Sequence, residues 1–218
     1  MAEKGIREMW LRIFAAVTLV LGMSGPVIAG AAEDYAEGMK WYNRGDYVSA
    51  MPELRKAADA GHVEAAASLA WILYGADMPE DAIKYYRQAA AAGNLDGMFG
   101  LGGMLAAGDG AKQDFAQAKA LFEKAAERGH APSVHGLAQA YMLGELGIPE
   151  DQRKGAEALK WITRAADLGF VRALELLEKS YRTGDFGLAV DVAKADELKK
   201  KIASLKPQQK KRRRGEAK

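Results

Sequence analysis

The sequence predicts an all-α solenoid of about five antiparallel helical hairpins, and two observations support this. A short pattern of alanines ending in glycine occurs four times, at intervals of 32, 36 and 40 residues. A second pattern with helical spacing precedes it in most copies. Repeats of roughly 20 to 50 residues are typical of stacked supersecondary units that bury a continuous core between neighbours. With 49% hydrophobic and 28% charged residues, the composition is that of an ordinary soluble protein.

The alanine pattern marks the second helix of each unit. An alanine is followed three residues later by a mostly bulky residue, then by an Ala-Ala pair, and three residues after that pair by glycine. The four copies are Ala50/Glu53/Ala57-Ala58/Gly61, Ala82/Tyr85/Ala89-Ala90/Gly93, Ala118/Leu121/Ala125-Ala126/Gly129 and Ala158/Trp161/Ala165-Ala166/Gly169. We expect the small side chains to let two helices approach closely, and each glycine to end its helix in the left-handed conformation.

The first helix of each unit shows steps of four, four and three residues, which keep four side chains on one face. These stripes are Ala65, Leu69, Leu73 and Ala76; Gly97, Leu101, Leu105 and Gly108; Ser133, Leu137, Tyr141 and Gly144; and Ala173, Leu177, Tyr181 and Gly184. From the last small residue of each of the first three stripes to the first alanine of the second helix, the distance grows from 6 to 10 to 14 residues. All variation in repeat length is therefore predicted to lie in the turn inside the hairpin.

The N-terminus has the order of a secretory signal peptide. Lys4, Arg7 and Arg12 precede an apolar run over residues 13–23, and small residues then offer cleavage sites after Ala29 or after Ala31. An apolar run of this length is too short to span roughly 30 Å of hydrocarbon. We expect residues 1–31 to be removed and the mature chain to be periplasmic. Export into the medium and an uncleaved membrane anchor are the alternatives.

Charge is unevenly distributed along the chain. Residues 30–198 hold 18 basic and 26 acidic residues, whereas residues 199–218 hold ten basic residues and one acidic residue. The absence of cysteine excludes a lipoprotein anchor, disulfides and thiol chemistry. We predict that residues 207–218 form a disordered basic tail, because they contain Pro207 and no apolar periodicity.

The repeats resemble the Sel1-like family, which is related to tetratricopeptide repeats. Its pattern is close to A-x-x-x-L-G-x-x-Y-x-x-G, a variable turn, and K-A-x-x-W-x-x-K-A-A-x-x-G, and the units over residues 97–129 and 133–169 are near-complete matches. Residues 42–50 of the first unit look like the tetratricopeptide pattern Y-x-x-G-D-Y-x-x-A. The resemblance implies a right-handed solenoid over residues 32–206, with units of about 33–62, 63–94, 95–130, 131–170 and 171–206. The last unit departs from the pattern, since it has Ile202-Ala203 and no closing glycine.

Residues for catalysis are scarce, so we predict no enzyme, cofactor or metal site. His130 and His135 are five residues apart and not the four that would place both imidazoles on one helix face. No S-x-x-K or G-x-S-x-G motif occurs. The acids of residues 77–81 and 149–151 are interpreted as stabilising the starts of second helices.

In tetratricopeptide-type solenoids, first-helix positions two and five residues on either side of the packing leucine line a concave groove. Carried over to this sequence, those that we expect to bind a partner are Glu64, Trp71, Tyr74, Asp96, Phe99, His135, Gln139, Met142, Arg172, Lys179 and Arg182. For Trp71 and Tyr74, burial against neighbouring helices is the equal alternative. In the tail, Lys210, Lys211, Arg212, Arg213 and Arg214 are candidates for binding an anionic surface, although a solvated tail is an equal reading.

Taken together, the sequence predicts a non-catalytic scaffold of the bacterial cell envelope that binds another protein or peptide. Neither nucleic acid nor a small-molecule substrate is expected. Two alternatives stay open: a cell-wall-associated protein that binds peptidoglycan or penicillin or assists a wall enzyme, and a periplasmic regulator of a sensor kinase.

Overall fold

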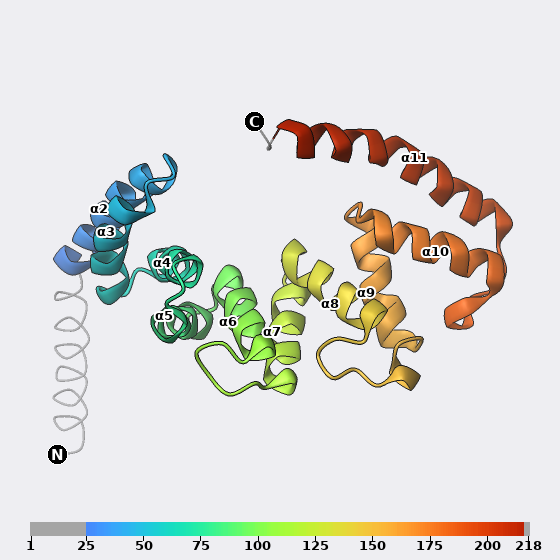
Figure 1. The fold of residues 1–218 in the computed structure, drawn as a ribbon, viewed down its shortest axis with the longest axis horizontal. Helices are drawn as coiled ribbons and strands as arrows, with labels where there is room; N and C mark the ends of the chain where they lie inside the picture. The colour runs from blue at the N-terminus through green and yellow to red at the C-terminus, as the bar shows by residue number, and fades with distance from the viewer. Residues whose placement is uncertain (1–24, 216–218) are drawn as a thin grey trace, which may run out of the picture. The chain divides into compact units, whose positions relative to one another are not determined.

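The fold was determined as a computed structural model, which describes residues 25–215 (Figure 1). Within this range the chain is helical and contains no strand. The α-helices are α2 (Gly25–Tyr42), α3 (Tyr47–Asp59), α4 (Val63–Gly75), α5 (Pro79–Ala91), α6 (Leu95–Ala107), α7 (Phe115–Glu127), α8 (Ala131–Leu143), α9 (Ala156–Asp167), α10 (Val171–Thr183) and α11 (Val192–Gly215). Two short 3₁₀ helices, η1 (Glu150–Gln152) and η2 (Asp185–Gly187), lie in connecting turns. None of the described helices is both long enough and apolar enough to cross a membrane.

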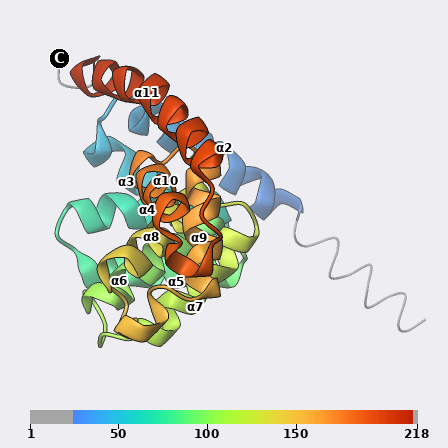
Figure 2. The ribbon, with the colours of Figure 1, turned by 90° about the vertical axis from the view of Figure 1, so that its right-hand side faces the viewer.

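The helices form two compact units, divided inside α6. The N-terminal unit contains α2 to α5 and residues 95–100 of α6, and the C-terminal unit contains residues 101–107 and all later helices. In both units the helices pack mainly on their neighbours in sequence, as α2 does on α3 (Figure 1) and α10 on α11 (Figure 2). This pairing is that of consecutive hairpins, and it confirms the predicted all-α repeat fold.

The alanine repeat is the packing skeleton of the second helices. Both members of each Ala-Ala pair are buried, and Ala50, Ala82, Ala118 and Ala158 are fully inaccessible. The four closing glycines have φ between 83° and 92°, in the left-handed region. After α3, for example, the amide of Gly61 donates to the carbonyl of Ala58 and that of His62 to Ala57, at 2.9 Å each. The predicted role of glycine as the end of each second helix is confirmed.

The first helices contribute the opposing stripe. Leu69, Leu73 and Leu137 are fully buried, and Leu101 and Leu177 are nearly so. Helix α6 packs closely on α5: a Cβ atom added to Gly97 would lie 2.6 Å from the Cβ of Ala89, and one added to Gly100 would overlap the ring of Tyr86. Helix packing thus explains Gly97, Gly100 and Gly102 of this helix, whereas Gly103 faces open space.

Turn length inside the hairpins varies as predicted. Three residues separate α4 from α5, while residues 144–155 separate α8 from α9 and contain η1. The interpretation of the acidic residues is wrong in the second case, because Glu150 and Asp151 lie in η1 and α9 begins only at Ala156. Glu80 and Asp81 do occupy the first turn of α5.

Helix α11 forms the second helix of the fifth hairpin despite lacking the alanine pair. Ala195 and Ile202 are buried against the rest of the hairpin, and Lys206 forms an ion pair with Glu175 on α10 at 2.7 Å. The helix then continues through Pro207 to Gly215, where the sequence predicted disorder. Proline lacks an amide donor and its ring crowds the carbonyl four residues earlier, but the preceding turns are already held against α10 and the helix extends from them.

The first hairpin starts earlier than the sequence indicated. Helix α2 begins at Gly25 instead of near residue 33, and both predicted cleavage sites lie within it. Ala31 is buried. Residues 1–24 of the signal peptide predicted over residues 1–31 lie outside the described residues, so the signal peptide stays a prediction.

Candidate interaction surface

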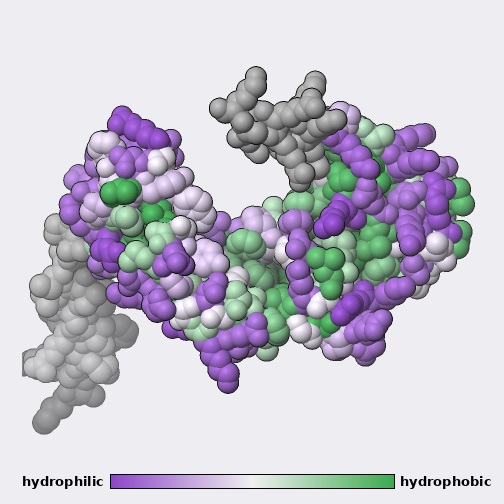
Figure 3. Space-filling view, viewed as in Figure 1, coloured by the Kyte–Doolittle hydropathy of each residue, from purple (hydrophilic) through white to green (hydrophobic). Residues whose placement is uncertain are grey.

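The N-terminal unit exposes five large apolar side chains, as many as the C-terminal unit does. Trp71 and Tyr74 at the end of α4 are 49% and 46% exposed, and Val48 near the start of α3 is 77% exposed. Tyr47 and Met78, also in this unit, are about as exposed as the two aromatic residues of α4. Figure 3 shows apolar surface among hydrophilic residues over α2 and α3. Exposed apolar groups that cluster in this way mark surfaces for interaction.

Three of these rings form an aromatic cluster, which we define as Tyr42, Tyr47 and Trp71. Tyr42 ends α2, Tyr47 begins α3 after a tight turn, and Trp71 comes from α4. The ring centroids are 5.4 to 5.6 Å apart, with interplanar angles of 60° to 70°. Such tilted and edge-to-face contacts are favourable for aromatic pairs. Contact with the two tyrosines at the first hairpin turn therefore holds the ring of Trp71 in place, while half of its side chain stays exposed.

A carboxylate lies within electrostatic range of this cluster. The pKa of Tyr42 is raised, chiefly by burial and further by Tyr47 and by Asp96 on α6. On α5, burial and the nearby Asp96 raise the pKa of Tyr86 to about 12. A nearby negative charge disfavours formation of phenolate, so Asp96 adds to the effect of burial at both tyrosines.

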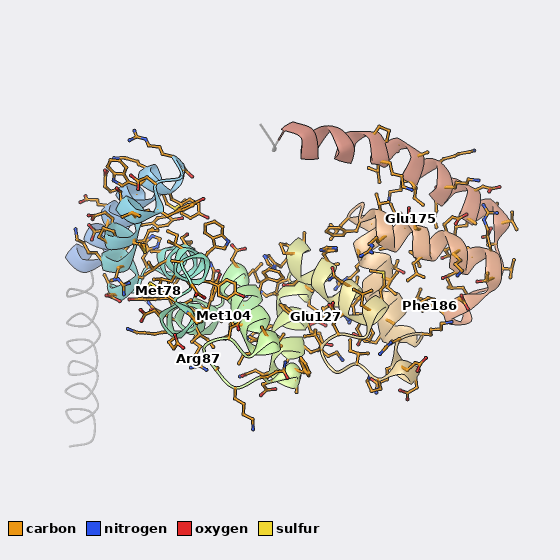
Figure 4. All side chains as sticks on the ribbon, in the orientation of Figure 1. Met78, Arg87, Met104, Glu127, Glu175 and Phe186 are labelled. Atoms are coloured by element: carbon orange, nitrogen blue, oxygen red, sulfur yellow. The ribbon has the colours of Figure 1, made fainter. Side chains whose placement is uncertain are left out.

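An apolar groove of about 580 Å³ lies in the same unit. Its lining is mostly apolar, and the residues that line it are Val48, Met51, Pro52, Arg55, Lys56, Asp59, Leu73 and Met78. Met78 is labelled in Figure 4. The hydroxyl of Tyr85 donates to Asp59 at 3.0 Å and accepts from Arg55 at 3.3 Å, so two of the charged groups are held in position. This volume lies in the range of binding sites for small ligands or single anchor side chains.

The binding residues predicted in the N-terminal unit are exposed or half-buried. Glu64 and Asp96 are exposed with Trp71 and Tyr74, while Phe99 is partly buried. The open question of whether Trp71 and Tyr74 are core residues is settled in favour of exposure. Glu64 lies 3.4 Å from His62, whose ring stacks on Tyr35 of α2.

In the C-terminal unit, several predicted binding residues have structural contacts. His135 stacks on Phe170 with ring centroids 4.3 Å apart. Arg182 bridges Glu178 on its own helix and Asp196 on α11 at 2.6 and 2.7 Å, so it joins two helices. The other four predicted residues are the partly buried Gln139 and Met142 and the exposed Arg172 and Lys179.

The side chains of the predicted anionic-surface segment, Lys210, Lys211, Arg212, Arg213 and Arg214, lie outside the described ones. Sequence reasoning did not include Tyr42 and Tyr47 in the site, nor the apolar groove. Tyr42 and Tyr47 lie on either side of the first hairpin turn, and the exposed Val48 follows. Large apolar side chains next to a solvated turn are the sequence signal that could have identified the two tyrosines.

Among the described residues, no group of three or more histidine, aspartate or glutamate side chains is placed to hold a metal ion. The rings and carboxylates of the N-terminal unit are suited to non-covalent binding. Aromatic side chains near a carboxylate attract apolar and cationic groups.

Comparisons with known proteins give the same fold. The Sel1 repeat family model matches residues 25–45, 63–94, 95–130 and 131–170, together more than half of the chain. The fifth hairpin, which departs from the repeat pattern, lies outside these matches. No curated protein matches the chain.

Three solved structures are similar. A protective antigen of uropathogenic Escherichia coli with an SLR fold is 24% identical, with a TM-score of 0.71, and the match covers 80% of this chain but only 38% of that one. A Sel1 repeat protein from Oxalobacter formigenes is 25% identical, with a TM-score of 0.61 and coverage of 79% and 70%. A putative Sel1 repeat protein from Klebsiella pneumoniae is 23% identical, with a TM-score of 0.54 and coverage of 82% and 89%.

Proposed function

Because the chain belongs to the Sel1 repeat family, whose members are generally protein-interaction scaffolds, we propose that it binds a protein partner through the first-helix surface of its N-terminal unit. The half-exposed Trp71 is the observation that carries this proposal. Trp161 on α9, by contrast, is completely buried. Binding hot spots are enriched in tryptophan and tyrosine, which bury large areas with little loss of side-chain freedom.

The arrangement supports binding in two ways. Contact with Tyr42 and Tyr47 fixes the orientation of Trp71 before a partner arrives, which lowers the entropy lost on association. The apolar groove offers a second place for an apolar side chain of the partner. The cluster and the groove are each apolar with charged residues nearby, as the cores and rims of binding surfaces are.

The test compares two variants that each remove an exposed apolar side chain. Trp71→Ala removes the proposed anchor, whereas Leu168→Ala removes a 51% exposed leucine at the end of α9 in the C-terminal unit. Partners are captured by crosslinking in cells, identified by mass spectrometry and purified for direct binding measurements. Trp71→Ala should weaken binding at least tenfold, and Leu168→Ala should leave it unchanged. Equal affinity of both variants, with circular dichroism spectra like those of the unaltered chain, would refute the proposed surface.

We further propose that the protein acts in the bacterial cell envelope after removal of an N-terminal signal peptide. The basic start, short apolar run and small residues up to Ala31 support this. Cell fractionation followed by N-terminal sequencing tests it. A mature chain that begins at residue 30 or 32 in the periplasmic fraction is expected, and an intact N-terminus in the cytoplasm would refute it.

A further inference from the structure

The two ends of the chain carry opposite charge. Residues 30–100 contain 6 basic and 11 acidic residues, a net charge of −5. Residues 207–218 contain 6 basic residues and one acidic residue, a net charge of +5. The scaffold function does not by itself account for this separation of charge.

Acidic groups dominate the first helices of the N-terminal unit. Over α2, α4 and residues 95–100 of α6, the charged residues from position 30 onward are Glu33, Asp34, Glu37, Lys40, Glu64 and Asp96. The one basic group among them, Lys40, is paired with Glu37 at 2.5 Å. These helices therefore present net negative charge, and they are the helices that carry Tyr42 and Trp71.

The aromatic cluster differs from five other rings of the described chain, which have a basic side chain over their faces. Elsewhere, a lysine or arginine lies 4.4 to 5.6 Å from the ring centroid of Trp41, Tyr85, Tyr141, Trp161 and Tyr181. Among the described residues, no basic side chain lies over Tyr42, Tyr47 or Trp71. Basic groups are attracted to the faces of such rings, most strongly to tryptophan.

The spacing of the cluster limits what it can bind. With centroids 5.4 to 5.6 Å apart, the three rings contact one another and leave no space between them for a cation. A cage around a quaternary ammonium group is therefore excluded. A basic side chain can stack only on the outer, exposed faces, and a peptide with several basic residues can do so while its other charges meet the carboxylates.

The C-terminal segment has this chemistry and extends beyond the folded hairpin. Helix α11 is anchored up to Lys206 by the buried Ile202, by the ion pair with Glu175 and by Lys201, which donates to the carbonyl of Ala166 at 3.2 Å. The twelve residues that follow hold five lysines and arginines in an unbroken run over 210–214. Anchoring of α11 leaves this run to act as a ligand without unfolding the fifth hairpin.

We propose that the basic segment 207–218 of one chain binds the aromatic cluster of a second copy, together with Asp96 and the carboxylates carried by the same first helices. The inference rests on the proposed function of that surface and names its partner. Because the donated segment and the accepting surface are different parts of the chain, the contact is heterologous and joins copies head to tail. The attraction is between solvent-exposed charges, so salt weakens it.

The first experiment measures binding of a fluorescent peptide of residues 206–218 to a chain that lacks residues 208–218. Binding is expected at about 50 mM NaCl and should be lost at about 500 mM, since salt screens exposed charges. Trp71→Ala should weaken it at least tenfold, and Asp96→Asn several-fold, whereas Leu168→Ala should have no effect. Equal binding to all three variants, or no binding at low salt, would overturn the proposal.

The second experiment measures the mass of the full chain by sedimentation velocity over a range of concentrations. Concentration-dependent assembly at low salt is expected, and deletion of residues 208–218 should abolish it. A full chain that stays monomeric at every concentration would overturn the proposed assembly of copies. If the peptide nevertheless bound in the first experiment, the segment would be assigned to the surface of its own chain. Salt-sensitive binding to anionic phospholipid vesicles without assembly would assign the segment to a membrane surface instead. None of these negative results refutes the proposed binding of a protein partner, which the crosslinking experiment tests separately.

Discussion

Substitution of glycine by alanine at two positions of α6 separates helix packing from helix propensity. Gly97 and Gly103 both lie within α6, so each substitution removes the same backbone flexibility. A Cβ atom at Gly97 would lie 2.6 Å from the Cβ of Ala89 and 2.9 Å from the backbone nitrogen of Ala90. A Cβ atom at Gly103 would have no neighbour within 4 Å.

The expected changes in the free energy of unfolding have opposite signs for the two variants. At Gly103, alanine should stabilise the helix by about 0.5–1 kcal/mol, because glycine loses more conformational freedom on folding. At Gly97 the same gain is offset by overpacking, which costs about 1–3 kcal/mol and lies at the upper end here because a backbone atom blocks the new methyl group. The net loss for Gly97→Ala is therefore about 2 kcal/mol.

Thermal unfolding followed by circular dichroism, with urea titration as a second measure, provides the assay. For a chain of this size each kcal/mol shifts Tm by about 2–4 °C. Gly97→Ala should lower Tm by about 4–8 °C, and Gly103→Ala should raise it by about 1–4 °C. If Gly97→Ala is as stable as Gly103→Ala, then α5 and α6 do not approach as closely as the structure shows, and the reasoning fails.

Three further predictions concern pH, a helix start and the core. The pKa of Tyr86 is raised from 10.0 to about 12, so the folded protein keeps the neutral phenol at pH values where the unfolded chain loses its proton. The stability that this neutral form contributes is present below about pH 10 and is lost as pH rises toward 12. Over this pH range the urea midpoint of Tyr86→Phe should therefore fall less than that of the unaltered chain. Asp114 accepts a hydrogen bond from the amide of Gln117 at 2.9 Å, so Asp114→Ala should lower the free energy of unfolding by about 1 kcal/mol, while Asp114→Asn, which keeps an acceptor, should lose less. Trp161 is fully buried and donates to Glu157 at 2.7 Å, so Trp161→Ala should cost about 3–5 kcal/mol in urea titrations, and a loss below 1 kcal/mol would contradict its place in the core.

Much of the fold could be predicted because it repeats. One ambiguous alanine pair says little, but four pairs with a glycine at the same offset constrain helix ends, packing faces and turn positions together. The repeat pattern is less informative at the two ends of the solenoid, where it is incomplete. Helix α2 begins at Gly25, where the Sel1 repeat match also begins, and α11 continues through Pro207 because its earlier turns are anchored on α10.

The candidate site could be predicted only in part. Trp71 and Tyr74 were assigned to the binding face by their offset from Leu69, but the same offset allowed burial, and only their exposure decides between the two. Arg182 had the correct position as well, yet its guanidinium bridges α10 and α11. Position in a repeat specifies the direction of a side chain, whereas its partners depend on the neighbouring helix.

The sequence by itself determined the repeat architecture, the helix-ending glycines and the separation of acidic body from basic tail, because these depend on local spacing and composition. Tertiary structure alone decided that Tyr42 and Tyr47 meet Trp71, that Asp96 lies near them, and that an apolar groove forms beside α3. These features join residues from different helices, and their distances follow from how closely the small side chains let those helices pack.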